Sequence, residues 1–153
     1  RWWGRWEVNY QASTAFVIRG LHGAGADMSS DWIQRGVDWL EGCQNEDGGW
    51  GEDVDTYVDW QAPGPWKSRV DLTGKVIMAL LAAGRGSGEA VRRGAQFLID
   101  SQREDGSWDV DNGVYVLLPP NLFYTNPTCN LAGGVEGLAM YRRFLDGAHP
   151  FAT

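Results

Sequence analysis

Two short acidic stretches carry the side chains of this sequence that could do chemistry. Residues 44–53 read QNEDGGWGED, and residues 102–109 repeat the stretch in a shorter form, QREDGSWD. Carboxyl groups gathered on a loop are typical of general acid–base catalysis, in which a side chain gives or takes a proton. The same residues could instead form a structural loop that the chain uses twice, and the elements around each copy decide between these interpretations.

The repeat extends well beyond the two loops. A shift of 58 residues aligns Arg35 with Arg93 and Trp50 with Trp108, and the upstream segments IRGLHGAG and IMALLAAG match at a shift of 59. Internal repeats of this length are typical of stacked supersecondary units. Both acidic stretches therefore occupy the same place in a unit of nearly 60 residues.

Each unit is predicted to consist of two helices. Apolar residues recur at helical spacing over residues 11–23 and about 31–44 in the first unit, and over 71–84 and about 88–102 in the second. No segment shows sustained strict alternation of apolar and polar residues, so the sequence predicts no sheet. Each acidic stretch then begins at the end of the second helix of its unit.

This position favours a structural role for both loops. A glutamine at a helix C-terminus can donate its amide to carbonyls that lack partners, and the following glycine can take a positive φ. The aspartate can accept backbone N–H bonds, and the tryptophan can stack back over the loop or over the glutamine amide. We expect a clamp between neighbouring helices in both copies, formed by Gln44, Asp47, Gly48 and Trp50 in the first and by Gln102, Asp105, Gly106 and Trp108 in the second.

Composition limits the class of protein. The net charge of −7 argues against nucleic-acid binding and against binding to anionic membranes by charge alone. Cys43 and Cys129 make no CxxC and no disulfide framework, so we expect reduced, mostly buried thiols. No apolar run approaches the roughly 18 residues that span a bilayer. The chain starts at Arg1 with the aromatic-rich RWWGRW, which predicts a fragment of a larger protein.

At these motifs the sequence resembles the terpene cyclase/mutase family, which includes the squalene–hopene cyclases. The pattern of Gln, a few residues, Asp-Gly and Trp in both loops is similar to the family's Gln-Trp motif. GRWEVNY at residues 4–10 resembles the family segment Gly-Arg-Trp-Gly-Val-Asn-Tyr. PPNLFY at 119–124 and the later GLAMYRRF resemble the family's C-terminal Phe-Pro-Gly-Asp-Phe-Tyr stretch and closing helix. The four matches follow the family order and cover nearly the whole chain.

The resemblance implies an all-α fold, a partial (α/α)6 toroid or barrel. Residues 1–153 would form the C-terminal part of one barrel domain of a two-domain cyclase, because five or six helices cannot close a barrel of twelve. The partners implied are the remainder of the same cyclase and an isoprenoid substrate. A bacterial-type cytoplasmic enzyme is implied as well, with peripheral, monotopic membrane contact left open.

The chemistry implied by the resemblance is protonation-initiated cyclisation of a linear polyprenyl or squalene-like chain. An Asp-x-Asp-Asp acid protonates an alkene or epoxide, and aromatic faces stabilise the cations that follow. In the family that acid lies upstream of the matched region. Asp53-Val-Asp55-Thr56 looks similar, but it directly follows the first loop, and Asp109-Val-Asp111 follows the second in the same way. We therefore expect no catalytic acid in this chain, no metal site and no cofactor, with Mg²⁺ needed only for a prenyl diphosphate substrate.

Four aromatic residues are the candidates for the wall of the substrate cavity. Trp6 matches the tryptophan of the family's GRW, which faces the cavity. Phe123 matches a phenylalanine that stabilises ring-forming cations in family members. Tyr124 and Tyr10 are weaker candidates that packing also explains.

The sequence also departs from the family. Ala12, Pro127 and Asn130 stand where family members often carry aromatic residues, and SRVDLTGK replaces the usual Ser/Gln-Thr-Ala-Trp pattern. Fewer π faces would stabilise fewer late cations. This difference favours a shorter or modified polyprenyl substrate, or a cascade that stops after fewer rings.

Other classes stay open on the residues alone. Protein prenyltransferase β subunits repeat similar turns but need zinc, and His22 and His149 lie far apart in the sequence without a Cys–Asp set beside them. A non-catalytic helical-repeat module could instead use Trp2, Trp3 and Trp6 as a ligand-facing or carbohydrate-stacking patch. A class II cyclase of shorter prenyl diphosphates is the nearest variant within the family.

Overall fold

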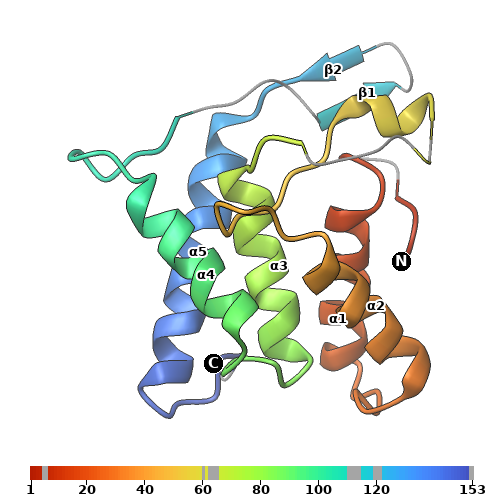
Figure 1. Cartoon of the computed structure of the whole chain (residues 1–153), viewed down its shortest axis with the longest axis vertical. Helices are drawn as coiled ribbons and strands as arrows, with labels where there is room; N and C mark the ends of the chain where they lie inside the picture. Colours follow the sequence, from red (N-terminus) through yellow and green to blue (C-terminus); the bar gives the residue numbers. More distant parts are fainter. Residues whose placement is uncertain (5–6, 60, 62–65, 110–114, 119–121, 152–153) are drawn as a thin grey trace.

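The computed structural model describes residues 1–4, 7–59, 61, 66–109, 115–118 and 122–151. Five α-helices account for most of these residues, as the sequence predicts for an all-α chain (Figure 1). They are α1 (Gln11–Gly23), α2 (Asp31–Gly42), α3 (Val70–Ala82), α4 (Glu89–Asp100) and α5 (Pro127–Leu145). A single 3-10 turn, η1 (Val54–Tyr57), follows the first acidic loop.

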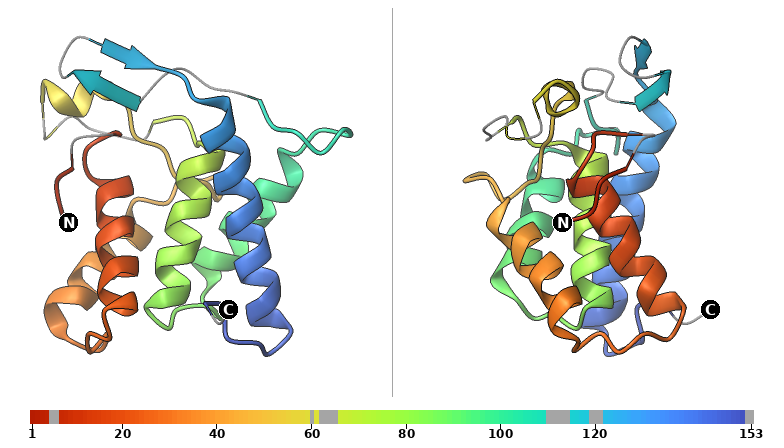
Figure 2. Two further views of the ribbon diagram at one scale, coloured as in Figure 1. Left: turned by 180° about the vertical axis from the view of Figure 1, so that it is seen from behind. Right: turned by 90° about the vertical axis from the view of Figure 1, so that its right-hand side faces the viewer.

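The helices form two layers. Helices α1, α3 and α5 lie side by side and run in the same direction, and α2 and α4 run the opposite way on one side of them (Figure 2). Every residue of α3 is buried, because this helix lies between α1 and α5 and under α4. We call α1, α3 and α5 the inner layer and α2 and α4 the outer layer. The first two helix pairs thus repeat one arrangement, in agreement with the sequence repeat.

Glycines bring α3 and α5 into close contact. A Cβ atom at Gly74 would lie 1.9 Å from the carbonyl oxygen of Gly133, and one at Gly137 would lie 2.6 Å from the Cα of Gly74. Such spacing leaves no room for a side chain at either helix surface. The small residues that replace bulky family residues in this segment therefore have a packing reason.

A short antiparallel ribbon corrects the expectation of no sheet. Strand β1 (Tyr115–Leu118) pairs with β2 (Leu122–Tyr124), and Val116 lies opposite Phe123. The strands have four and three residues, which is too short for an alternating pattern to stand out in the sequence. The ribbon lies above the N-terminal ends of α1 and α3 (Figure 1), and the ring of Phe123 lies 5.9 Å from that of Tyr57 in η1.

The buried core is continuous between the two layers. It includes Ile18 of α1, Val37 of α2, Ile77 of α3 and Leu98 of α4, all fully buried. Among the described residues, no helix has both the length and the apolar character that crossing a bilayer requires.

Candidate functional site

The tryptophan of the first loop is the most buried part of that loop. Trp50 has no exposed surface, and its indole Nε1–H donates to the backbone carbonyl of Leu40 at 2.7 Å. The backbone N–H of Trp50 donates to Oγ1 of Thr73 at 3.0 Å. A Cβ atom at Gly94 would lie 2.7 Å from the indole ring. One side chain thus contacts α2, α3 and α4 together.

The glutamine of the first loop connects the two outer helices. Gln44 lies two residues beyond the end of α2, so the predicted helix end is wrong by two residues. Its Nε2–H donates to the carbonyls of Gly48 and Ala90, both at 2.8 Å. In return, Nη2 of Arg93 donates to the carbonyls of Asn45 and Glu46. The amide therefore bonds to its own loop and to the first turn of α4, where the sequence predicted the last carbonyls of α2.

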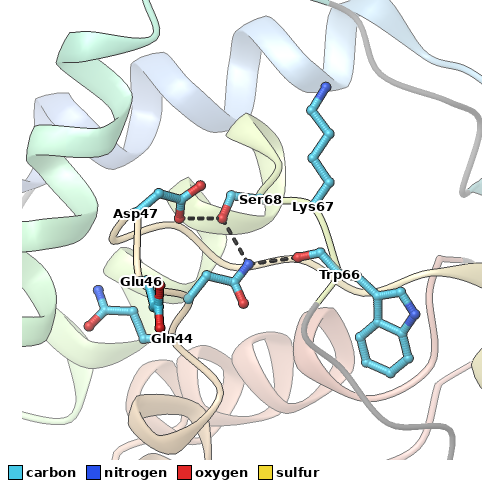
Figure 3. A pocket seen from close by; sticks show the side chains of 7 residues that line it. Gln44, Glu46, Asp47, Trp66, Lys67 and Ser68 are labelled. Atoms are coloured by element: carbon cyan, nitrogen blue, oxygen red, sulfur yellow. Dashed lines mark hydrogen bonds between the residues drawn. The ribbon is translucent and has the colours of Figure 1, made fainter.

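The aspartate of the first loop is held by hydrogen bonds at the loop surface. Oδ1 of Asp47 accepts from the backbone N–H of Gly49 at 2.9 Å and from Oγ of Ser68 at 2.6 Å. Gly48 has a φ of +91°, which fits the turn expected there. The loop borders an open hollow of about 500 Å³ (Figure 3), which is lined by Gln44, Asn45, Glu46, Asp47, Trp66, Lys67 and Ser68.

The second loop repeats this geometry with more of its surface exposed. Nε1–H of Trp108 donates to the carbonyl of Leu98 at 2.8 Å, and Nε2–H of Gln102 donates to the carbonyl of Gly106 at 2.9 Å. Oδ1 of Asp105 accepts two hydrogen bonds from Ser107, which lower the pKa of this carboxyl. Trp108 is buried, whereas Gln102 and Asp105 are exposed, so the second copy has the same internal bonds without the covering contacts of the first.

Trp2 makes the same contacts as Trp50, which sequence reasoning missed. Its backbone N–H donates to Oγ1 of Thr14 at 2.8 Å, as Trp50 does to Thr73. A Cβ atom at Gly36 would lie 2.4 Å from the Trp2 ring, as one at Gly94 would lie close to Trp50. Thr14 and Gly36 precede their counterparts by 59 and 58 residues, and these two alignments are the signal that could have located the position.

Comparison with known proteins agrees with this repeated geometry. The family model described as "Squalene-hopene cyclase C-terminal domain" matches residues 1–128. This chain belongs to that family. The match contains both loops and the first two helix pairs, and it ends at the start of α5.

Individual cyclases are similar over most of this chain. The squalene–hopene cyclase of Alicyclobacillus acidocaldarius is 46% identical over 108 residues, which are 71% of this chain and 17% of that protein. The squalene–hopene cyclase of Bradyrhizobium diazoefficiens is 39% identical over 109 residues, again 71% of this chain, and 16% of that protein. A terpene cyclase–glycosyl transferase fusion protein of Humicola fuscoatra is 35% identical over 95% of this chain and 11% of its own length. This chain therefore spans about a sixth of the squalene–hopene cyclases that it matches.

The aromatic candidates of this family member lie in different surroundings. Phe123 is half-buried against Tyr57, while Tyr124 on the same strand is exposed. Tyr10 is half-buried at the start of α1, where the guanidinium of Arg1 lies 4.5 Å from its ring. Trp6 lies outside the described residues. The recorded ring contacts join these candidates to Tyr57 and Arg1 and do not join one candidate to another.

A buried carboxylate supports the segment before α1. Glu52 is 2% exposed and accepts from the backbone N–H groups of Tyr10 at 2.9 Å and Gln11 at 2.6 Å. Burial raises the pKa of Glu52, and the two backbone N–H groups oppose that shift. This residue satisfies N–H groups at the start of α1 that the helix itself leaves unpaired. Sequence reasoning assigned Glu52 no role, because its partners are about 40 residues away in the chain.

The Asp-x-Asp lookalike lies on η1. Asp53 precedes this turn, its backbone carbonyl accepts from Oγ1 of Thr56 at 2.9 Å, and Asp55 within the turn is exposed. Asp111, in the corresponding position after the second loop, lies outside the described residues.

Charged side chains gather on α3 and the segment before α1. Nη2 of Arg69 contacts both carboxylate oxygens of Asp71 at 2.9 and 3.0 Å. Nζ of Lys75 lies 3.1 Å from Oδ2 of Asp71 and 2.6 Å from Oε2 of Glu7. Sequence reasoning did not single out this set, which we call the inner ion-pair network.

Two sequence expectations about possible metal ligands need correction. His22 and His149, far apart in the chain, have ring centroids 6.0 Å apart, and the ring of Phe151 lies 5.0 Å from that of His22. Cys43 and Cys129 are free thiols as expected, but they are half-buried rather than buried. Burial raises the pKa of Cys43 to about 11. Within the described part of the chain, no group of three His, Cys, Asp or Glu residues could hold a metal ion.

Proposed function

We propose that this chain is the C-terminal segment of a class II terpene cyclase, an enzyme that protonates a linear isoprenoid and guides the resulting cation through ring closure. The observation that carries the proposal is the repeated bonding of Trp50 and Trp108 in two Gln-Trp loops, within a chain whose family match covers residues 1–128. The similar proteins named squalene–hopene cyclases support squalene or a related polyprenyl chain as the substrate.

Within that cyclase, the Gln-Trp loops act as clamps. Trp50 bonds to α2 and contacts α4, and Gln44 reaches the first turn of α4, so the first loop resists separation of neighbouring helix pairs. We propose the same role for the second loop toward the next helix pair of a partial (α/α)6 toroid. The exposure of Gln102 supports this role, because its counterpart Gln44 bonds to a neighbouring helix.

The cavity wall is proposed to come from the inner layer and the ribbon. Phe123 and Trp6 are the main candidates for stabilising cations, and Tyr10 and Tyr124 are secondary ones. The general acid is proposed to lie upstream of residue 1, so the isolated chain has no cyclase activity. The reaction is an isomerisation by intramolecular transfer or a lyase reaction, it needs no cofactor, and it needs Mg²⁺ only if the substrate is a prenyl diphosphate. We retain a cytoplasmic location and peripheral membrane contact as predictions for the whole cyclase.

Product analysis tests the proposal. The full-length protein that contains this chain is incubated with squalene and with shorter linear prenyl substrates, and the products are identified by gas chromatography and mass spectrometry. We expect a cyclic product from at least one of them, and no product from residues 1–153 alone. A full-length, folded protein that cyclises none of these substrates would contradict the proposal.

A further inference from the structure

The inner ion-pair network lies on the face of α3 that points away from the outer layer. Thr73 bonds to Trp50, which contacts α4 through Gly94, so Thr73 points toward the outer layer. Asp71 and Lys75 are each two residues from Thr73, about 200° around the helix, and therefore lie on the opposite face. In a toroid built from these layers, that face is the inner one.

A neighbouring aromatic residue confirms the direction. Phe16 holds the same position in α1 as Lys75 does in α3, two residues after the threonine that bonds to a tryptophan. Phe16 is 45% exposed, and its ring lies 5.6 Å from Nζ of Lys75. The ammonium group and an exposed aromatic ring thus lie together on the inner face.

Stability alone does not account for four charged side chains in this place. Removing ions from water costs several kcal/mol per ion, and apolar residues of similar volume are often at least as stabilising as a buried ion pair. The side chains of Asp71 and Arg69 are only 1% and 7% exposed, while those of Lys75 and Glu7 are 10% and 16% exposed. The accessible edge of the network therefore consists of one ammonium and one carboxylate, held 2.6 Å apart.

The chemistry of this edge selects one kind of ligand group. A hydroxyl can accept a hydrogen bond from the ammonium and donate one to the carboxylate at the same time. The network holds two positive and two negative side chains, so it offers no net charge to balance a diphosphate. An ether oxygen could use the ammonium only, and a hydrocarbon end could use neither group.

Resting on the proposed cyclase function, we propose that Glu7 and Lys75 form a polar subsite that binds a hydroxyl group of the isoprenoid substrate. The subsite makes the cyclase prefer a polyprenyl alcohol to a hydrocarbon of the same size. It also shortens the apolar part of the cavity, which agrees with the scarcity of aromatic residues at the positions of Ala12 and Pro127.

Competition between matched substrates tests this subsite in the full-length cyclase. The substrates are squalene, hexaprenol (a linear polyprenyl alcohol with as many carbons as squalene) and the methyl ether of hexaprenol, and kcat/KM is measured for each. We expect the wild-type cyclase to prefer hexaprenol over both others by at least about 10-fold, because buried charged partners strongly disfavour a ligand that leaves them unpaired. Glu7→Met, which leaves the Lys75–Asp71 and Arg69–Asp71 pairs intact, should reduce this preference to within about 2-fold.

Controls separate this inference from the proposed function. Arg92→Met removes an exposed ion pair with Glu89 on α4 and should keep the wild-type preference. If the melting curve shows that Glu7→Met does not fold, Lys75→Met is judged by the same criterion. A wild-type cyclase without the preference, or a folded variant that retains it, overturns the subsite while the cyclase function stands. A wild-type protein that cyclises none of the three, nor any shorter prenyl substrate, overturns the cyclase function itself.

Discussion

The side-chain amide of Gln44 donates to the backbone carbonyl of Ala90 at 2.8 Å, across 46 positions of the chain. This bond joins the loop after α2 to the first turn of α4. Gln102 holds the same position in the second unit, and its recorded bond, to Gly106, stays within its own loop. The two copies therefore allow the clamp between helix pairs to be separated from the local turn.

Replacing each glutamine by methionine tests that separation. Gln44→Met removes a part-buried donor that serves two carbonyls, and we expect it to lower the free energy of unfolding by about 1–3 kcal/mol. Gln102→Met removes one exposed bond and should cost about 0.5 kcal/mol or less. Urea denaturation followed by circular dichroism measures both. Equal losses in the two variants would contradict the clamp.

The glycine contact between α3 and α5 gives a second pair of variants. A Cβ at Gly74 would lie 1.9 Å from a backbone oxygen of α5, so Gly74→Ala should lower the free energy of unfolding by about 3 kcal/mol or more. At Gly20, in α1, a Cβ would meet no atom within 4 Å. Gly20→Ala should therefore stabilise the chain by roughly 0.5–1 kcal/mol, because alanine favours the helix. Thermal unfolding of both variants is the measurement, and a stable Gly74→Ala chain would show that α5 does not pack as described.

Burial of Glu52 predicts a pH dependence of stability. Its pKa is higher in the folded chain than in the unfolded chain, so the folded state binds the proton more tightly. The contribution of Glu52 to stability is then largest below the unfolded pKa and is lost as the pH rises toward the folded pKa. Stability is measured by urea denaturation across this pH range for the wild type and for Glu52→Gln. We expect the wild type to gain relative to the variant as the pH falls, and a constant difference would count against the shift.

The raised pKa of Cys43 predicts slow alkylation near neutral pH. The thiolate is the reactive form, and burial raises the pKa of this thiol to about 11. In a Cys129→Ser variant, the rate of reaction with iodoacetamide should still be rising at pH 10. A rate that levels off near pH 8.5 would show that the thiol is not desolvated as described.

Local patterns in the sequence were sufficient to predict much of the fold. The four predicted helices match α1 to α4 within two residues at each end, because an apolar stripe at helical spacing is a strong signal. Gln44 and Gln102 were placed at helix ends but lie two residues beyond them. The strands of the ribbon were missed because each is too short for a visible alternation.

Contacts between distant residues were out of reach of the sequence alone. Glu7 and Lys75 are separated by 68 positions, and neither belongs to a motif that would pair them. Trp2 was interpreted as part of an aromatic patch, since its partners Thr14 and Gly36 gain meaning only by comparison with Thr73 and Gly94. The functional surface of this chain depends on such pairs more than on the conspicuous acidic loops.

Deuterium incorporation tests the central claim most directly. The full-length cyclase is run in D₂O with its best isoprenoid substrate, and the product is analysed by mass spectrometry. Protonation-initiated cyclisation takes one hydron from the solvent through the enzyme's acid and ends with loss of a substrate proton, so the account predicts a cyclic product with one carbon-bound deuterium. A cyclic product without deuterium, formed with release of diphosphate, would contradict it.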